Sequence, residues 1–463
     1  LAGAQDPWFV LGYALLLDVG AAFAARARRW PWPEALAVAG TIILYVSQTP
    51  SPPDLRWLFT SFVILYYGLF RESGTAAVAA AAQTIAGVAA IELWTPSAEA
   101  LWIPLAMEVA GLAIADRRGW PSQVAASFAG FWLAYAAWAA QVSEPRPVAM
   151  PLAFCTASYL LFLAWPVWRA ERRRLPLRLL DLLLVALNAG LYFGTCYFLL
   201  APGFGPWEGL FAVAVAVVQM ASARLLWRYD ARGSMLAAAA AWVLLVLAAP
   251  IQFAGYRITI AWALEGAAVA WLGVRMRDAR ASFAAFAVFL LVIARLGWID
   301  SRMFPNPAAV PLVMNARFLT FAVSAAALWA CAWWIRQGPM AFAAYAGGHA
   351  VMLWGLSLEA VGWAARTSSP DNFVSAASMS ISVLAGAYAV LLVAGGAARR
   401  SAITRMLGVG LIGLVILKLY LYDVWLLGQF YRMAAFAILG VLLLVMSYLY
   451  SRFRGSIENL WRS

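Results

Sequence analysis

Charged side chains that lie within or beside apolar segments are the residues of this sequence best suited to chemistry. A guanidinium presents a planar fork of donors that suits phosphate or carboxylate, and an acid in such a place can act as a base or titrate. In the second half of the chain these residues occur at the ends of apolar runs, with Tyr hydroxyls nearby. The candidate substrate-binding set is Arg257, Glu265, Arg295, Asp300, Arg317, Glu359, Lys418, Tyr422, Asp423 and Arg432.

One depth, near the outer membrane interface, is expected for six of these candidates: Arg295, Asp300, Arg317, Lys418, Asp423 and Arg432. Arg295 and Asp300 end one apolar run, Arg317 opens the next, and Arg432 opens the last. Only tertiary packing can bring side chains from such distant runs together. Three interpretations stay open: a structural ion-pair network that ties helices, an outward-opening polar cavity for an anionic group, and proton coupling with Glu265 or Glu359 as the titrating group.

Other patterns give little support for familiar catalytic chemistry. The three cysteines lie inside apolar runs without a C-x-x-C pair, and a single histidine is present. No P-loop, G-x-G-x-x-G, G-x-S-x-G or H-E-x-x-H pattern occurs. We therefore predict no metal and no cofactor, and the catalytic residues stay unknown. Six further polar residues within apolar runs are predicted to form hydrogen bonds between helices: Asp18, Gln83, Glu108, Asp181, Asn188 and Gln219.

The elements that must position these residues are membrane-spanning helices. Of 463 residues, 65% are hydrophobic and 12% charged, and the mean hydropathy is +0.80. No soluble fold of this length hides so much apolar surface, so lipid must be the solvent. Backbone groups cannot stay unpaired in lipid, which predicts helices. The fold class is all-α, polytopic, with about 17 transmembrane helices arranged as tandem helical hairpins with short loops.

The expected spans alternate with short basic turns, which predicts their orientation. Of 33 Lys and Arg residues, 24 lie in every second turn or at the C-terminus. By the positive-inside rule, these turns are cytoplasmic and the N-terminus is outside. The net charge of +12 is explained in the same way, so nucleic acid is not a predicted partner. Trp30, Trp32, Trp120, Trp168 and Trp227 flank these turns, as interfacial anchors do. The predicted spans are 8–25, 33–48, 55–70, 74–91, 100–115, 121–141, 148–167, 177–200, 207–226, 233–250, 256–274, 281–299, 315–335, 340–362, 372–396, 402–422 and 430–451.

Several segments of the second half carry a family resemblance. They are Ala261–Gly266, Asn315–Thr320, Leu417–Asp423, Tyr431–Arg432 and Ser447–Phe453. Spread over about 255–454, they resemble the C-terminal part of the predicted bacterial membrane proteins catalogued as domain of unknown function 2339. Members of that family usually carry more spans and an upstream coiled coil, so the chain is expected to be part of a longer protein. We divide the chain into residues 1–254, with about 10 spans, and residues 255–463, with about 7.

The resemblance implies no activity, so function is inferred from the charged residues. The first hypothesis is an inner-membrane protein that binds or translocates an anionic envelope lipid or a lipid-linked glycan through an outer-facing Arg/acid cavity. A second is an integral-membrane transferase that uses a lipid-linked donor, with Glu265, Glu359 or Asp423 as acid or base. A third is a non-catalytic scaffold that holds other envelope proteins. The expected location is the bacterial inner membrane, with membrane lipids as partners.

Overall fold

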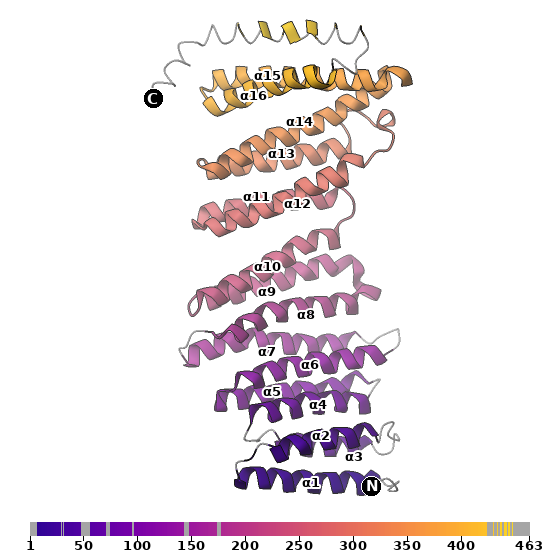
Figure 1. Cartoon of the computed structure of the whole chain (residues 1–463), viewed down its shortest axis with the longest axis vertical. Coiled ribbons are helices and arrows are strands. Elements are labelled where there is room, and N and C mark those ends of the chain that lie inside the picture. The colour runs from indigo at the N-terminus through magenta and orange to yellow at the C-terminus, as the bar shows by residue number, and fades with distance from the viewer. Residues whose placement is uncertain are drawn as a thin grey trace. The chain divides into compact units, whose positions relative to one another are not determined.

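The computed structural model describes residues 7–28, 30, 32–47, 56–70, 75–94, 97–142, 148–173 and 177–423, with scattered positions between 429 and 447. The described residues form α-helices joined by short turns and contain no strand (Figure 1). The predicted all-α class is therefore confirmed, and the chain is a polytopic membrane protein. The candidate Arg432 lies outside the described residues.

Length and composition mark many of these helices as membrane-spanning. Eleven segments among the described residues are long and apolar enough to cross a bilayer, and one of them, Leu179–Leu226, contains two helices. Three shorter apolar helices accompany them: Trp32–Leu44, Thr60–Phe70 and Ala76–Ile91. The count of about 17 spans stays a prediction, and the last predicted span, 430–451, lies mostly outside the described residues.

Contacts divide the chain into two compact units, Leu1–Ala248 and Ala249–Ser463. The predicted division between residues 254 and 255 stays a prediction. The helices of the first unit are α1 (Pro7–Arg28), α2 (Trp32–Ser47), α3 (Arg56–Phe70), α4 (Ala76–Trp94), α5 (Trp102–Arg118), α6 (Pro121–Gln141), α7 (Ala149–Arg173), α8 (Leu179–Phe204) and α9 (Glu208–Leu226). Helix α10 (Ala231–Gln252) contains the boundary. The second unit holds α11 (Arg257–Met276), α12 (Ala279–Trp298), α13 (Ala316–Ile335), α14 (Pro339–Thr367), α15 (Phe373–Ala398), α16 (Ala402–Lys418) and the π-helix η7 (Leu419–Asp423).

The second unit is a series of helical hairpins in which each hairpin packs on the next. Helices α11 and α12, α13 and α14, and α15 and α16 form three hairpins; α11 also packs on α13, and α14 on α15. Close approach requires small residues at the contacts. A Cβ at Gly408 of α16 would come within 2.8 Å of the Ala389 carbonyl oxygen of α15. Phe289 of α12 and Phe321 and Leu328 of α13 belong to one buried core, to which α11 and α14 also contribute.

Buried polar side chains link the helices of the first unit. Thr41 donates to Asp18 at 2.8 Å and Ser158 donates to Glu108 at 2.8 Å. These bonds join α1 to α2 and α5 to α7. Since lipid offers no hydrogen-bonding partner, such groups must find one on another helix. The remaining predicted partners bond in the same way: Gln83 to Ser127, Asp181 to Arg169, Asn188 to the Tyr159 carbonyl and Gln219 to the Val185 carbonyl. The prediction of interhelical hydrogen bonds is confirmed for all six residues.

The turn between α9 and α10 is organised by one carboxylate. Asp230 accepts backbone N–H bonds from Arg232 at 2.8 Å, Gly233 at 3.1 Å and Leu177 at 3.2 Å. Burial raises the pKa of Asp230, but the backbone donors of Gly233, Arg232 and Leu177, aided by the Arg232 charge, outweigh burial and lower the pKa below its ordinary value. The same carboxylate thus caps α10 and pins it to the loop before α8.

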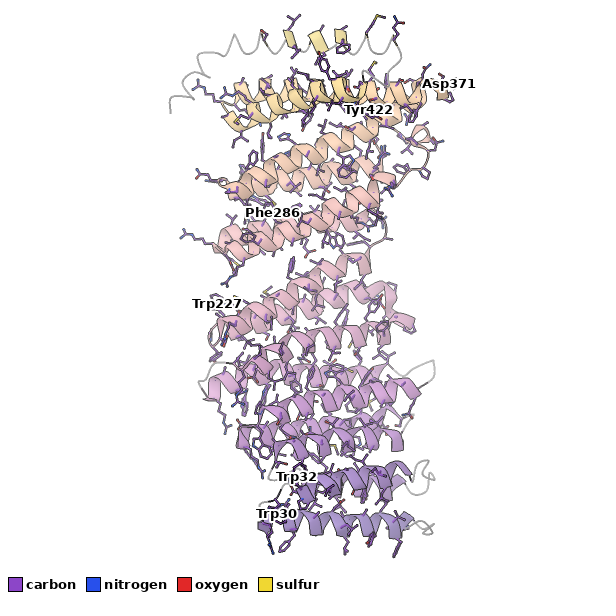
Figure 2. All side chains as sticks on the ribbon, viewed as in Figure 1. Trp30, Trp32, Trp227, Phe286, Asp371 and Tyr422 are labelled. Carbon is purple, nitrogen blue, oxygen red and sulfur yellow. The ribbon has the colours of Figure 1, made fainter. Side chains whose placement is uncertain are left out.

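In the first unit, tryptophans lie at the helix ends that adjoin the basic turns. Trp30, Trp32 and Trp227 lie at one common end, on the left in Figure 2. Each of the three is highly exposed. An exposed indole beside a basic turn suits the membrane–water interface, where its ring meets lipid and its N–H meets water.

Candidate functional site

The ends of α11 and α12 are held together by the first of three charged contacts. Arg295 of α12 donates to the Thr259 hydroxyl of α11 at 2.9 Å and to the Gly255 carbonyl at 2.8 Å. The Thr259 hydroxyl in turn donates to Asp300 at 2.5 Å. Arg295 lies 3.9 Å from Asp300, which is fully buried. The hydroxyl therefore bridges a cation and an acid that the sequence places five residues apart.

A second charged contact joins α13 to α14. Arg317 donates to Glu359 at 2.9 Å, and both side chains are almost fully buried. Glu359 also accepts from the Val313 backbone N–H at 2.9 Å and from the Asn315 amide at 3.0 Å. Asn315 caps the N-terminus of α13 with the same side chain. Glu359 thereby ties the loop before α13 to α14.

A third charged contact joins α15 to α16. Lys418 donates to Asp423 at 2.9 Å and to the Ser378 and Ser382 hydroxyls at 2.9 and 2.7 Å. Both serines also donate to Asp423. The π-helix that follows α16 has a wider turn than an α-helix, which brings residues five apart onto one face. The Tyr422 ring lies 5.8 Å from the Lys418 ammonium.

We call these three contacts the clasps, each named by its cation: Arg295, Arg317 and Lys418. Each clasp joins the two helices of one hairpin at the end opposite its connecting turn. In each, a carboxylate neutralises the cation, so the guanidinium or ammonium already has an anionic partner.

Two further candidates on α11 lie outside the clasps. Arg257 is exposed at the start of this helix, and Glu265 is half-buried within it, with one carboxylate oxygen that lacks a hydrogen bond.

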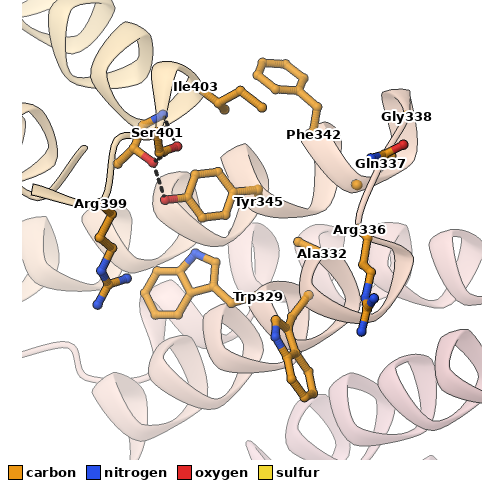
Figure 3. A pocket seen from close by; sticks show the side chains of 13 residues that line it. Trp329, Ala332, Arg336, Gln337, Gly338, Phe342, Tyr345, Arg399, Ser401 and Ile403 are labelled. Atoms are coloured by element: carbon orange, nitrogen blue, oxygen red, sulfur yellow. Dashed lines mark hydrogen bonds between the residues drawn. The ribbon is translucent and has the colours of Figure 1, made fainter. Parts of the chain in front are cut away.

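An open cavity lies at the other end of the second and third hairpins. We call it the turn cavity; its volume is about 700 Å³. Arg336 comes from the turn after α13 and Arg399 from the turn after α15, so two basic turns border one space. Figure 3 shows the Trp329 and Tyr345 rings between these two arginines. The lining is Trp329, Ala332, Trp333, Arg336, Gln337, Gly338, Ala341, Phe342, Tyr345, Arg399, Ser401, Ile403 and Thr404.

The turns that contribute to this lining are shaped by glycine, proline and a capping serine. Gly338 has φ 95°, which favours glycine, and Pro339 follows at the first turn of α14. Ser401 caps α16. Thr404 donates to the Ser401 hydroxyl at 2.8 Å, so the hydrogen bond of 2.9 Å between Tyr345 and Thr404 uses the tyrosine as donor. Tyr345 therefore connects α14 to α16 across the cavity wall.

Trp329 lines the turn cavity and packs against α14. A Cβ at Gly348 would lie only 2.5 Å from its Nε1 atom, so the indole fits because α14 carries glycine there. Its ring also contacts His349 at 5.0 Å between centroids. The buried Nε1 of Trp329 has no hydrogen-bond partner among the described residues. An indole N–H can only donate, so it needs an acceptor.

Sequence reasoning used the turn-cavity arginines only as orientation signals. Arg336 and Arg399 belong to the basic turns that predict a cytoplasmic side, and the aromatic residues near them were not singled out. The available signal was the pairing of a basic turn with a tryptophan or tyrosine one or two helical turns away. Nothing in the sequence indicates that the two turns meet.

Comparison with known proteins supports the family resemblance. Residues 279–453 match the family described as predicted membrane protein (DUF2339). The match contains the turn cavity and the three clasp cations, whereas Arg257, Thr259 and Glu265 precede it. No curated protein and no solved structure matches the chain. The family description gives membrane location and no activity.

Proposed function

We propose that this chain binds the phosphate headgroup of an anionic lipid or lipid-linked glycan in the turn cavity. The observation that carries the proposal is the meeting of Arg336 and Arg399 at one open space. Two guanidinium groups with no acidic residue in the described lining attract an anion, and their planar donors match phosphate oxygens.

The aromatic part of the lining favours an amphiphile over a free ion. Trp333 and Phe342 are exposed, and Ile403 lies beside them. Apolar side chains next to a basic turn suit a ligand whose head is charged and whose tail enters lipid. A cavity of about 700 Å³ is within the usual size range of small-molecule sites.

The charged residues first considered for the outer face support a different role. The clasp cations already contact Asp300, Glu359 and Asp423. Displacing an acid to admit a ligand would leave a carboxylate buried without its partner, which is strongly unfavourable. In this proposal the clasps therefore close the hairpins, and the ligand binds at the opposite end.

The distribution of positive charge supports an orientation in the membrane. We propose the bacterial inner membrane, with the basic turns and the C-terminus in the cytoplasm. The turn cavity would then face the inner leaflet, whose anionic lipids attract basic groups.

A second candidate is a non-catalytic scaffold for other envelope proteins. The observation that favours it is the series of three clasps, since each hairpin is tied at both ends and presents a stiff surface. The transferase alternative is supported less well, because Glu359 and Asp423 are engaged in ion pairs.

Native mass spectrometry of the purified chain with added phosphatidylglycerol tests headgroup binding. The double variant Arg336→Gln and Arg399→Gln should weaken retention of this lipid about a hundredfold or more, because it removes two charged hydrogen bonds and each contributes about 1.5–3 kcal/mol. Arg400→Gln is the matched control, since Arg400 is adjacent, exposed and outside the cavity lining. Equal retention by the double variant and the control would refute the proposal and favour the scaffold.

A further inference from the structure

A second cavity, in the first unit, is lined by arginines from two successive basic turns. We call it the arginine cavity; its volume is about 320 Å³. Arg117 and Arg118 end α5, Arg169 lies near the end of α7, and Arg178 precedes α8. The remaining lining is Ala115, Asp116, Gly119, Trp120, Pro121, Val124 and Trp165. We propose that this cavity is a phosphate-binding site, separate from the turn cavity and independent of the function proposed above.

Hydrogen bonds hold the two basic turns against each other. Arg178 donates to the Gly119 carbonyl at 3.3 Å, which links the loop before α8 to the turn after α5. Asp181 accepts from Arg169 at 2.6 Å and from the Arg178 backbone N–H at 2.9 Å. The guanidinium of Arg118 stacks over the Trp120 ring, 4.7 Å from its centroid. Three of the four arginines, Arg118, Arg169 and Arg178, are therefore positioned by contacts with other residues of the protein.

The charge of the lining matches a phosphate. Asp181, which lies outside the lining, neutralises Arg169. The described lining holds four arginines against one acid, Asp116. The lining therefore carries an excess of positive charge, which attracts the negative charge of a phosphate. Guanidinium forks provide the paired donors that phosphate oxygens accept.

Trp165 provides an independent sign that a ligand with acceptor atoms belongs here. Its side chain is only 7% exposed and lines the cavity, yet its indole Nε1 has no partner among the described residues. Its ring is fixed against Trp168, at 5.3 Å between centroids. Buried donors are normally satisfied, and an indole N–H cannot accept. A phosphate oxygen bound by the arginines would satisfy this donor.

The composition of the lining distinguishes this site from the turn cavity. Five of its eleven lining residues are charged, against two of thirteen in the turn cavity. Its volume suits a phosphate with a small substituent rather than an acyl chain. The phosphate belongs either to a soluble phosphate compound or to a lipid headgroup at the membrane edge. Both sources offer the same chemistry to Arg117, Arg178 and Trp165.

Titration calorimetry on the purified full chain in detergent tests the site with inorganic phosphate, against chloride at equal ionic strength. A second arm measures binding of the chain to nanodiscs of phosphatidylcholine with and without phosphatidic acid. We expect the double variant Arg117→Gln and Arg178→Gln to bind at least tenfold more weakly than the wild type in the arm that shows binding. Trp165→Phe, which keeps a ring but removes the N–H donor, should weaken binding severalfold.

Arg172→Gln is the matched control, because Arg172 is exposed near the end of α7, stacks on Trp168 and lies outside the cavity. Binding of inorganic phosphate supports a soluble ligand, and binding to phosphatidic acid alone supports a lipid headgroup. Absence of binding in both arms overturns the proposal, and so does an equal loss in Arg172→Gln. If the double arginine variant does not fold, Trp165→Phe decides. Variants of Arg336 and Arg399 should leave this site unaffected, so its failure and that of the turn cavity are distinguishable.

Discussion

Replacing Arg317 by methionine removes the cation of one clasp and leaves its acid buried. The Arg317 and Glu359 side chains are only 5% and 7% exposed. Breaking a buried pair costs about 3–5 kcal/mol, whereas replacing both partners costs far less. Glu359 still accepts hydrogen bonds from Val313 and Asn315 after the change, which favours the lower end of this energy range. We expect Arg317→Met to lower the free energy of unfolding by about 3 kcal/mol.

The double variant Arg317→Met and Glu359→Gln should lose only about 1 kcal/mol, because no buried charge is left unpaired and the new amide still accepts from the backbone. The two substitutions are therefore expected to be non-additive: the double variant should be about 2 kcal/mol more stable than Arg317→Met alone.

The chain carries a reporter for this measurement. Cys331, on the same helix as Arg317, is a free thiol that is 1% exposed. With Cys155 and Cys196 replaced by alanine, a thiol-reactive dye reports unfolding of the second unit in mixed detergent and SDS. Arg366→Gln is the matched control, since that arginine is exposed and donates to a backbone carbonyl at the same end of α14; its expected cost is within about 0.5 kcal/mol. An Arg317→Met variant as stable as this control, or additive effects in the double variant, would refute the clasp reasoning.

Three further outcomes are expected. Gly348→Ala should displace Trp329 and destabilise the second unit by about 1–3 kcal/mol, whereas Gly347→Ala, whose Cβ would meet its nearest atom at 3.8 Å, should be tolerated; equal thermal unfolding temperatures would contradict this. Because the folded pKa of Asp230 lies below its unfolded value of about 4, its stabilisation is present above that pH and disappears as pH falls through the folded pKa. The free energy of unfolding of the wild type should therefore fall between about pH 6 and pH 3, and that of Asp230→Ala should fall less. Parallel pH dependences of the two proteins would contradict the role given to Asp230. In a cysteine-free background, Asp371→Cys should react with a membrane-impermeant maleimide added outside intact cells. If the new thiol reacts only after the cells are lysed, the orientation is the reverse of the one proposed.

For two clasps, the cation and the acid could be grouped from the sequence. Arg295 precedes Asp300 by five residues, and Lys418 precedes Asp423 by five, so each cation and acid were grouped at the end of one predicted span. Their hydroxyl partners were not identifiable, because Thr259 and Ser378 lie on other helices. The partner of Arg317 was a member of the candidate set, but no spacing rule pairs it with Glu359.

Membrane class and helical content follow from the sequence alone because each apolar segment partitions into lipid by its own composition, and its backbone must then satisfy itself as a helix. Helix pairing is different, since it depends on which small and polar faces fit against each other across the chain. Only the tertiary structure therefore decided that the clasp cations meet separate acids, and that Arg336 and Arg399 border a common cavity. A segment's hydrophobicity adds up residue by residue, whereas a binding site depends on contacts between residues that are far apart in the chain.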